Sequence, residues 1–180
     1  MRFYIFLLFL FFCVLTKLYI TNMASRSDLG DVTPNNLGQV RILHNVLFPV
    51  HYGDNFYNDL LEAGEFAKLA YYNDVCVGTV CCRKEADESN PNNYKVYIMT
   101  LGVLEPYRHL GLGSKLVQHI LEQAKLAKDI TQVYLHVQTN NTLAVDFYKK
   151  NQFEVVSTEK DYYKNIENRD AYLLSKNIEQ

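Results

Sequence analysis

A short glycine-rich turn, Arg108-His109-Leu110-Gly111-Leu112-Gly113, has the composition of an anion-binding site. It lies between a run with strand-like alternation and a helix-like apolar repeat, so its glycines fall where a helix begins. Free backbone N–H groups and the positive end of the helix dipole attract phosphate there, and missing side chains let a pyrophosphate approach the backbone. The full Gly-x-Gly-x-x-Gly and Walker lysine motifs are absent, and a tight turn without a ligand explains two glycines equally well.

Tyr97 and His136 are the candidates for proton transfer, and they lie on two different predicted strands. Histidine titrates near neutral pH, and tyrosine is also used in acid–base catalysis. Taken alone, however, a buried core phenol and a satisfied strand histidine are the more common explanations of such residues. The residue types therefore allow a catalytic pair without requiring one.

The elements that would position these residues follow from periodicity and turn signals. We expect an α/β fold, with a single mixed and mostly antiparallel sheet flanked by helices. Thr33 and Pro34 are expected to start the first helix, Asp54 to cap the second, and Asn73-Asp74 to form a tight hairpin turn. In chain order the prediction is strand 26–32, helices 34–46 and 55–62, strands 66–72 and 75–84, surface loop 84–93, strand 94–103, helix 111–128, strand 132–138, helix 140–150 and strands 153–158 and 171–175.

Alternation within the two candidate strands predicts which side chains share a face. The strand over 94–103 is apolar on both sides, which is typical of a central strand. Its predicted faces are Lys95, Tyr97, Met99 and Leu101 against Tyr94, Val96, Ile98 and Thr100. In the strand over 132–138, Val133, Leu135 and Val137 oppose Tyr134, His136 and Gln138.

Composition indicates one globular domain behind an apolar leader. The chain has 180 residues, of which 48% are apolar and 21% charged, so neither disorder nor a fibrous repeat fits. Without Arg2 and Lys17, the remaining 16 basic and 20 acidic residues give a net charge of −4, which argues against general attraction to nucleic acid or anionic membranes. The four cysteines form no zinc pattern, and adjacent Cys81 and Cys82 would point to opposite faces of a strand, so reduced thiols are expected.

The leader, residues 1–22, allows three interpretations. Arg2 followed by an apolar run resembles a secretory signal, but no clear small-x-small cleavage site follows. As a membrane span the run is interrupted by Lys17 before the roughly 20 residues that are needed. We favour the third interpretation, an upstream extension with Met23 as the working start, and expect the domain to occupy 23–180.

The glycine turn and the elements around it resemble a known family. Arg108-x-x-Gly111-x-Gly113 after a long strand, with a second strand and the 141–148 helix downstream, is similar to the acetyl-CoA signature of the GCN5-related N-acetyltransferases. Within that family the resemblance is to enzymes acting on protein N-termini. It covers residues 26–176 and rests on these blocks: Leu29-Gly30-Asp31-Val32-Thr33-Pro34, Phe48-Pro49-Val50-x-Tyr52, Ala67-Lys68-Leu69-Ala70-Tyr71, Tyr97-Ile98-Met99-Thr100-Leu101-Gly102, Tyr134-Leu135-His136-Val137-Gln138, Asp146-Phe147-Tyr148 and Tyr162-Tyr163-Lys164.

This resemblance implies roles for individual residues. Tyr97 and His136 would share the general-base role through an ordered water, Tyr148 would be the candidate general acid for the departing thiolate, and a backbone N–H near Leu101 would polarise the carbonyl. No metal is expected. Acetyl-CoA, as the acetyl donor, would contact Leu101, Gly102, Val103, Arg108, His109, Leu110, Gly111, Leu112, Gly113, Ser114, Asn141, Ala144, Phe147 and Tyr148.

The implied reaction is acetylation of the α-amino group of protein N-termini, chiefly those that retain the initiator Met. An apolar groove between two aromatic segments would bind the peptide through Phe48, Pro49, Val50, Tyr52, Met99, Tyr162, Tyr163 and Lys164. Two alternatives stay open, a protein lysine acetyltransferase and a low-activity scaffold subunit. The resemblance further implies partners in the auxiliary and catalytic subunits of the NatA complex on the ribosome, no direct nucleic-acid binding, and residence in the cytoplasm and nucleus.

Overall fold

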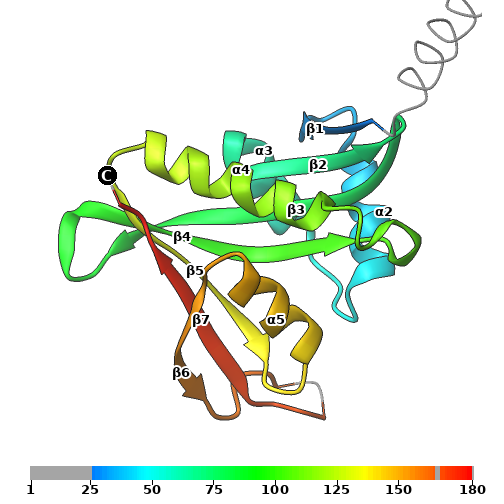
Figure 1. Cartoon of the computed structure of the whole chain (residues 1–180). Helices are drawn as coiled ribbons and strands as arrows, with labels where there is room; N and C mark the ends of the chain where they lie inside the picture. The colour runs from blue at the N-terminus through cyan, green and yellow to red at the C-terminus, as the bar shows by residue number, and fades with distance from the viewer. Residues whose placement is uncertain (1–25, 165–166, 180) are drawn as a thin grey trace, which may run out of the picture.

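A single seven-stranded sheet organises the chain, as the computed structural model shows for residues 26–164 and 167–179 (Figure 1). The strand order is β1-β2-β3-β4-β5-β7-β6. Neighbouring strands run antiparallel except β4 and β5, which are parallel. This arrangement confirms the predicted mixed, mostly antiparallel sheet, whereas the predicted leader lies outside the described residues. No helix among the described residues has the length and apolar character to cross a membrane.

The order of elements is the predicted one, with shifted bounds. They are β1 (Ser27–Asp31), α2 (Leu37–Leu47), α3 (Asp54–Glu62), the short 3-10 helix η1 (Gly64–Phe66), β2 (Ala67–Tyr72), β3 (Val75–Asp87), β4 (Asn90–Val103), η2 (Glu105–Tyr107), α4 (Leu112–Leu126), β5 (Ile130–Gln138), α5 (Thr142–Lys150), β6 (Glu154–Glu159) and β7 (Ala171–Asn177).

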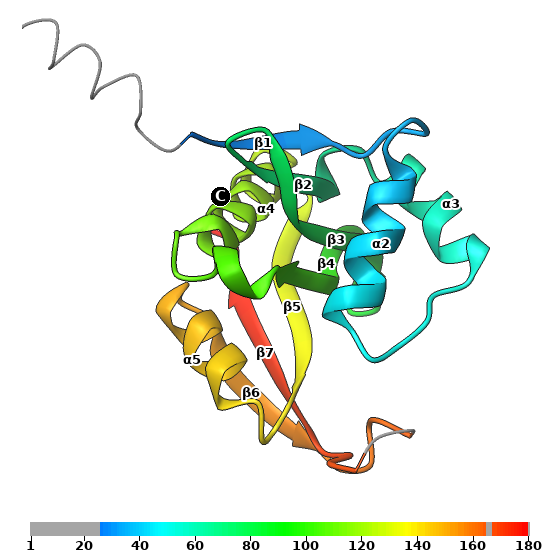
Figure 2. The same cartoon turned by 90° about the vertical axis from the view of Figure 1, so that its right-hand side faces the viewer.

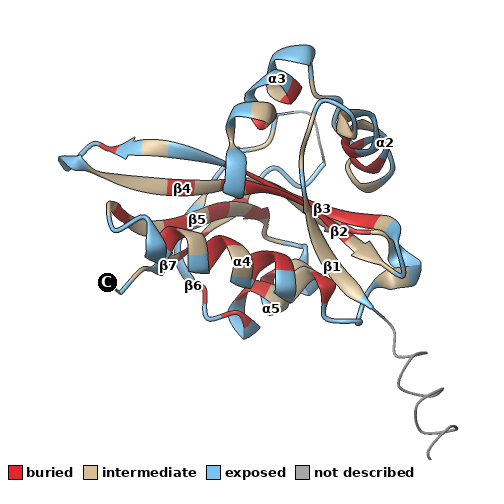
Figure 3. Ribbon diagram, turned by 90° about the horizontal axis from the view of Figure 1, so that it is seen from above, coloured by how far each residue is buried: buried red, intermediate tan, exposed pale blue. Residues whose placement is uncertain are grey.

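Three predicted boundaries are wrong, each for a local reason. The first helix begins at Leu37, because Asn36 accepts a hydrogen bond from the Thr33 N–H and holds the residues before it in a turn. Asp54 is the first residue of α3 but does not cap it, because its carboxylate pairs with Arg41 at 2.8 Å. The segment 84–93, expected as a loop, belongs largely to the β3–β4 hairpin. Polar residues fit these strands because the hairpin extends beyond the helices that cover the rest of the sheet (Figure 3).

Helices cover both faces of the sheet and create two apolar cores (Figure 3). On one side, α4 and α5 pack over the sheet; on the other, α2 and α3 do so. The α4 stripe buries Leu112, Leu116, Val117, Ile120, Leu121 and Ala124, and each fully buried large side chain contributes about 1.5–3 kcal/mol. Cys81 and Cys82 enter opposite cores, as strand alternation requires, and the three cysteines in the described residues are free.

A β-bulge in β4 changes which side chains share a face. The pairing with β3 skips Met99, which is the extra residue in β4. Since side chains alternate with a period of two, one inserted residue reverses the pattern beyond it. The predicted alternation holds up to Met99 and is wrong for Thr100 and Leu101, which exchange faces. Thr100 contacts His44 on α2, and Leu101 packs against the core that α4 covers.

The parallel pair β4–β5 separates soon after it forms. Paired residues run from Tyr94 to Tyr97 on β4 and from Ile130 to Tyr134 on β5, and no pairing between these strands follows in the described chain. Figure 1 shows the two strands diverging, with α5 lying across the wedge and the start of α4 near the far end of β4. The end of β4, the glycine turn and α5 therefore lie around the place where the two strands separate.

Candidate active site

The predicted anion-binding turn leads directly into α4. Gly111 precedes the helix with φ of 79°, a left-handed conformation that glycine adopts at little cost, and His109 also has a positive φ of 62°. No side-chain hydrogen bond caps the helix, so the first N–H groups of α4 are available to an anion. Because the side chain of Leu112 is buried, this residue can contribute only its backbone. The turn has the geometry of a pyrophosphate cradle.

Neighbouring contacts hold the cradle in place. A Cβ on Gly113 would lie 3.2 Å from the Phe147 ring, so the glycine allows α4 and α5 to approach closely. The Arg108 Nε donates a 3.1 Å hydrogen bond to the Val103 carbonyl oxygen, which ties the turn to the end of β4. The predicted cofactor residues on β4, the turn and α5 are thereby brought together.

On α5, two predicted residues also have structural roles. The Asn141 side chain accepts a hydrogen bond from the Ala144 N–H at 3.1 Å and so caps the helix. Tyr148 is almost fully buried and packs edge-on against Phe147 and Phe153. Burial raises the pKa of the Tyr148 phenol far above its usual value, so this side chain stays protonated at neutral pH. That is the state a proton donor needs.

The two candidate proton-transfer residues meet where β4 and β5 part. The rings of Tyr97 and His136 lie 5.7 Å apart, and Tyr162, from the loop after β6, stacks on His136 at 4.0 Å with an interplanar angle of 12°. The hydroxyl oxygens of Tyr97 and Tyr162 are 3.1 Å apart. Burial, followed by the hydrogen bond to Tyr162, raises the pKa of Tyr97 strongly. Residues 65 positions apart thus form one aromatic, polar cluster.

Tyr163 connects this cluster to the second aromatic segment. Its hydroxyl donates a 3.3 Å hydrogen bond to the backbone oxygen of His136. Burial, then the neighbouring phenols of Tyr162 and Tyr52, raise the pKa of Tyr163 to about 12. Tyr52 belongs to the loop between α2 and α3, and Figure 2 shows this loop and the loop after β6 at the same end of the sheet.

The loop between α2 and α3 rests on an aromatic box around His44. The imidazole is fully buried and its centroid lies 5.2 Å from that of Tyr52 and 5.5 Å from that of Phe48. Its Nε2 lies 3.3 Å from Thr100 Oγ1, which joins the box to β4. A Cβ on Gly102 would lie 3.2 Å from Phe48 and closer still to Leu47, so the glycine lets the end of α2 and the start of this loop pack closely on the strand.

Not every predicted peptide-binding residue joins these contacts. Met99 packs with the core beneath α2 and α3, beside the aromatic box. Pro49, Val50 and Lys164 are exposed, and no contact of their side chains places them in the cluster. A role in peptide binding therefore stays a prediction for Pro49, Val50 and Lys164.

Three further side chains belong to the cluster but were not predicted. Glu159 Oε2 lies 3.2 Å from His136 Nε2. Tyr134 donates a hydrogen bond to Glu85, and its ring lies 5.0 Å from that of Tyr97. Alternation already places Tyr134 on the face of His136, so the sequence contains a signal for it. Glu85 and Glu159 lay in or beside segments expected as loops, where no periodicity predicts the direction in which a side chain points.

The cluster offers proton acceptors and donors but no metal centre. Across residues 26–164 and 167–179, no group of three His, Cys, Asp or Glu side chains is arranged to hold a metal ion. What the arrangement provides is an anion cradle at the start of α4, a split between two strands, and an imidazole with phenols at the base of the split. Such a site suits group transfer from a phosphate-bearing carrier.

Comparisons with known proteins agree with this geometry. The chain is 50% identical over 156 residues to N-alpha-acetyltransferase 50 of Danio rerio, covering 87% of this chain and 91% of that protein. It is 52% identical over 154 residues to the probable N-acetyltransferase san of Drosophila melanogaster, covering 86% and 82%. The solved structure of Arabidopsis thaliana Naa50 in complex with the bisubstrate analogue CoA-Ac-MVNAL is 53% identical, with a TM-score of 0.77, and covers 83% of this chain and 97% of that one.

The family model of the acetyltransferases (GNAT) matches residues 38–153, which run from α2 to the residue before β6. This span contains the glycine turn, the split between β4 and β5, and both Tyr97 and His136. On the strength of the fold, the cradle and this match, the chain belongs to the GNAT family of acetyltransferases.

Proposed function

We propose that this protein transfers the acetyl group of acetyl-CoA to the α-amino group of protein N-termini. The observation that carries the proposal is the cluster of Tyr97, His136 and Tyr162 at the point where β4 and β5 separate. It is supported by the 50% sequence identity to N-alpha-acetyltransferase 50 and by the similarity to the solved structure of Naa50 with a bisubstrate analogue. The acetyl group and the α-amino nitrogen would meet between the cradle and the aromatic loops.

The cradle and the edge of β4 would hold acetyl-CoA. The N–H groups at the start of α4 suit the pyrophosphate, with Arg108 adding positive charge beside them. The segment 101–103 of β4 is not paired with β5, so its backbone groups on that side can bind the pantetheine chain. One of its N–H groups would stabilise the negative charge that develops on the thioester oxygen.

His136 and Tyr97 would prepare the amine. An α-amino group has a pKa near 8, so it must lose a proton before its nitrogen can attack at neutral pH. The raised pKa of Tyr97 keeps this phenol protonated, which suits it to orient a water molecule or the amine. His136 is then the group that takes the proton, directly or through that water.

The transfer itself forms one bond and breaks one. The neutral amine forms a C–N bond with the acetyl carbon, the C–S bond breaks, and the sulfur leaves with the electron pair. A protonated phenol near the thiolate would neutralise it, and Tyr148 on α5 is protonated at neutral pH because it is buried. The ammonium loses one proton through His136 before attack, and the nitrogen loses a second when the C–N bond forms. One of these protons restores the Tyr148 phenol and the other passes to solvent, so protons and charge balance over the cycle.

The aromatic loops favour a peptide that begins with an apolar residue. Phe48 and Tyr52 approach from one side and Tyr162 and Tyr163 from the other, so apolar surface and phenol hydroxyls line the entrance. The analogue in the similar solved structure carries a peptide that begins with Met. We therefore expect this protein to act on N-termini that retain the initiator Met.

A direct test incubates the full chain with acetyl-CoA and a library of peptides that vary at the first two residues, followed by mass spectrometry of the products. We expect acetyl groups on the α-amino nitrogen of Met-initiated peptides. Peptides with a blocked N-terminus and free lysines serve as the matched control. Acetylation of lysine side chains alone would favour the lysine acetyltransferase, and bound acetyl-CoA without any turnover would favour the scaffold subunit.

We propose that the protein works with the auxiliary and catalytic subunits of the NatA complex at the ribosome, in the cytoplasm and the nucleus. The similarity to N-alpha-acetyltransferase 50 supports this assignment. Copurification with ribosomes from cells that express the tagged full chain would test both assignments.

A further inference from the structure

His136 is held by a carboxylate from a strand two places away in the sheet. Glu159 ends β6, which is separated from β5 by β7, yet its Oε2 lies 3.2 Å from His136 Nε2. The His136 side chain is 10% exposed, and the ring of Tyr162 stacks over it at 4.0 Å. The contact therefore belongs to a largely enclosed imidazole.

A bulge in β6 creates this contact. The pairing of β6 with β7 steps from Val155 to Ser157, so Val156 is the extra residue. Beyond the bulge, Glu159 pairs with Ala171, and Ala171 in turn pairs with Gln138 on β5. Directly paired residues share a face, so the bulge brings Glu159 to the same face as His136; without it the side chain would point to the opposite face.

The carboxylate determines which imidazole nitrogen carries the proton. An ionised carboxylate only accepts hydrogen bonds, so the neutral His136 must donate through Nε2–H, and Nδ1 keeps its lone pair. The other tautomer would place two sets of lone pairs against each other and leave a buried N–H at Nδ1, which has no hydrogen-bond partner among the described residues. A flipped ring would set a carbon against the carboxylate.

We infer that Glu159 is a positioning residue that holds His136 in the Nε2–H tautomer, so that Nδ1 is the atom that accepts a proton during acetyl transfer. Once His136 is protonated, both nitrogens carry hydrogen and the carboxylate stabilises the imidazolium, as in other acid–histidine pairs. The other titratable groups facing the ring are the phenols of Tyr97, Tyr134 and Tyr162, which are neutral donors. This inference rests on the proposed function for its role in catalysis, but the tautomer itself does not.

The first experiment measures the tautomer without any substrate. The full chain, labelled with ¹⁵N-histidine, is examined by NMR, and the signal of His136 is assigned by its loss in His136→Asn. We expect a protonated Nε2 and an unprotonated Nδ1 in the wild type, and a mixture of tautomers in Glu159→Gln, since the amide can either accept from or donate to Nε2. A wild-type signal from protonated Nδ1 would overturn the inference.

The second experiment measures the consequence for acetyl transfer. We expect Glu159→Gln to lower kcat on the order of tenfold while KM for acetyl-CoA and peptide changes less than twofold, because the residue acts on the base and touches neither substrate. The matched control is Glu154→Gln, an exposed glutamate on the same strand, which should keep wild-type kinetics. A Glu159→Gln enzyme with wild-type kcat would refute the positioning role.

The two experiments also separate the inference from the proposed function. If the wild type acetylates no peptide but its His136 tautomer depends on Glu159, the dyad stands and the proposed function fails. If the wild type is active but the His136 tautomer is the same in Glu159→Gln, the proposed function stands and the positioning role of Glu159 fails. Thermal unfolding of both variants shows that any loss of kcat occurs in folded protein.

Discussion

Tyr97 illustrates how its surroundings determine what a side chain can do. Its hydroxyl lies 3.1 Å from that of Tyr162, and its pKa is raised by burial first and by this hydrogen bond second. A phenol with a raised pKa is a poor base near neutral pH but a persistent hydrogen-bond donor. The tyrosine is therefore better suited to hold a water or amine in place than to remove the proton itself.

Replacing Tyr97 with Phe should consequently reduce kcat by about 10²-fold, within the range usual for a group engaged in proton transfer. His136→Asn should cost at least as much, because the proposed proton acceptor itself is lost. Steady-state kinetics with a Met-initiated peptide measure both. Tyr94→Phe, three residues earlier on the same strand, is the control, and equal losses of kcat in Tyr94→Phe and Tyr97→Phe would indicate a general structural defect.

His44 links the stability of the protein to pH. The imidazole is fully buried, and burial lowers its pKa to about 4 from an ordinary value near 6.5. Between these values the unfolded chain binds a proton that the folded chain does not, so stability decreases as pH falls from about 7 to 4. By linkage the loss attributable to His44 is on the order of 3 kcal/mol.

Urea unfolding of the wild type and of His44→Gln at pH 7, 6 and 5 tests this expectation. At pH 7 the wild type should be more stable, since its buried ring packs against Phe48 and Tyr52. The advantage should shrink as the pH falls, because glutamine does not titrate. A constant difference between the two proteins over this pH range would show that His44 takes up protons equally in both states.

At the residue scale, the sequence indicated that Tyr97 and His136 belong together, and the structure places their rings 5.7 Å apart, whereas the other contacts of the cluster were harder to predict. The glycine turn, Tyr97 and His136 were identified by motif and family resemblance. Glu159 was not, because its direction depends on a bulge at Val156 that no periodicity reveals. Phe48 and Tyr162 were predicted to bind peptide, but their packing depends on segments far apart in the chain, which a sequence pattern cannot place together.

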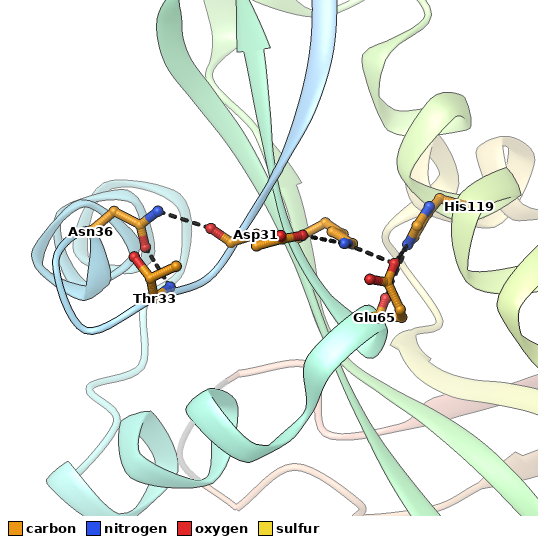
Figure 4. A network of polar contacts seen from close by, with 6 residues as sticks. Asp31, Thr33, Asn36, Glu65 and His119 are labelled. Atoms are coloured by element: carbon orange, nitrogen blue, oxygen red, sulfur yellow. Dashed lines mark hydrogen bonds and ion pairs between the residues drawn. The ribbon is translucent and has the colours of Figure 1, made fainter.

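At the scale of elements, a buried lysine connects β1, β2, η1 and α4 (Figure 4). Lys68 is 5% exposed and its ammonium binds Asp31 and Glu65, the second at 2.8 Å. The Glu65 carboxylate also lies 3.2 Å from His119 Nε2 on α4. The hydrogen bond to Lys68 and its charge lower the pKa of Asp31, so the stability from this pair is present above the unfolded pKa near 4 and is lost as pH falls below it.

Two variants of this network should differ in stability. Lys68→Met removes a buried charge and keeps the volume, so we expect a change within about 1 kcal/mol. The double variant Asp31→Asn, Glu65→Gln leaves the buried ammonium without anionic partners and should cost about 2 kcal/mol or more. Urea unfolding at pH 7 compares the two, and a Lys68→Met protein less stable than the double variant would contradict the expected order.

Strand and helix order followed from the sequence because periodicity is a local property. The apolar repeat of α4 and the Asn73-Asp74 turn, with φ of 47° and 64°, matched their predictions. The bulge at Met99 and the start of α2 did not, since the bulge depends on pairing with β3 and the start of α2 depends on the Asn36 side chain, which accepts a hydrogen bond from the Thr33 N–H. Local pattern predicts elements, whereas their exact register depends on their neighbours.

At the scale of the whole molecule, the parallel pair β4–β5 should make stability depend on acetyl-CoA. The strands pair only near Tyr94–Tyr97, so a ligand that binds both the cradle and the edge of β4 stabilises the folded state without binding the unfolded chain. At a hundredfold excess over Kd, the gain is about 2.7 kcal/mol. We expect acetyl-CoA to raise Tm by several degrees, measured by calorimetry. The control is acetyl-4′-phosphopantetheine, which lacks the adenosine 3′,5′-bisphosphate portion of acetyl-CoA and should raise Tm less.

The same split separates the chain into two parts that fold from different contacts. Strands β1 to β4 pair mainly with sequence neighbours, and β5 to β7 form a second antiparallel group. Among the strands of residues 26–164 and 167–179, only the β4–β5 pair joins the groups, and α4 must cross from one strand to the other before that pair can form. Because closing such a long connection is slow compared with forming hairpins, the cluster of Tyr97, His136 and Tyr162 should be among the last parts of the protein to assemble. A nascent chain would then be able to form its anion cradle once α5 has emerged, and would complete the cluster around His136 later, because that cluster includes Glu159 and Tyr162.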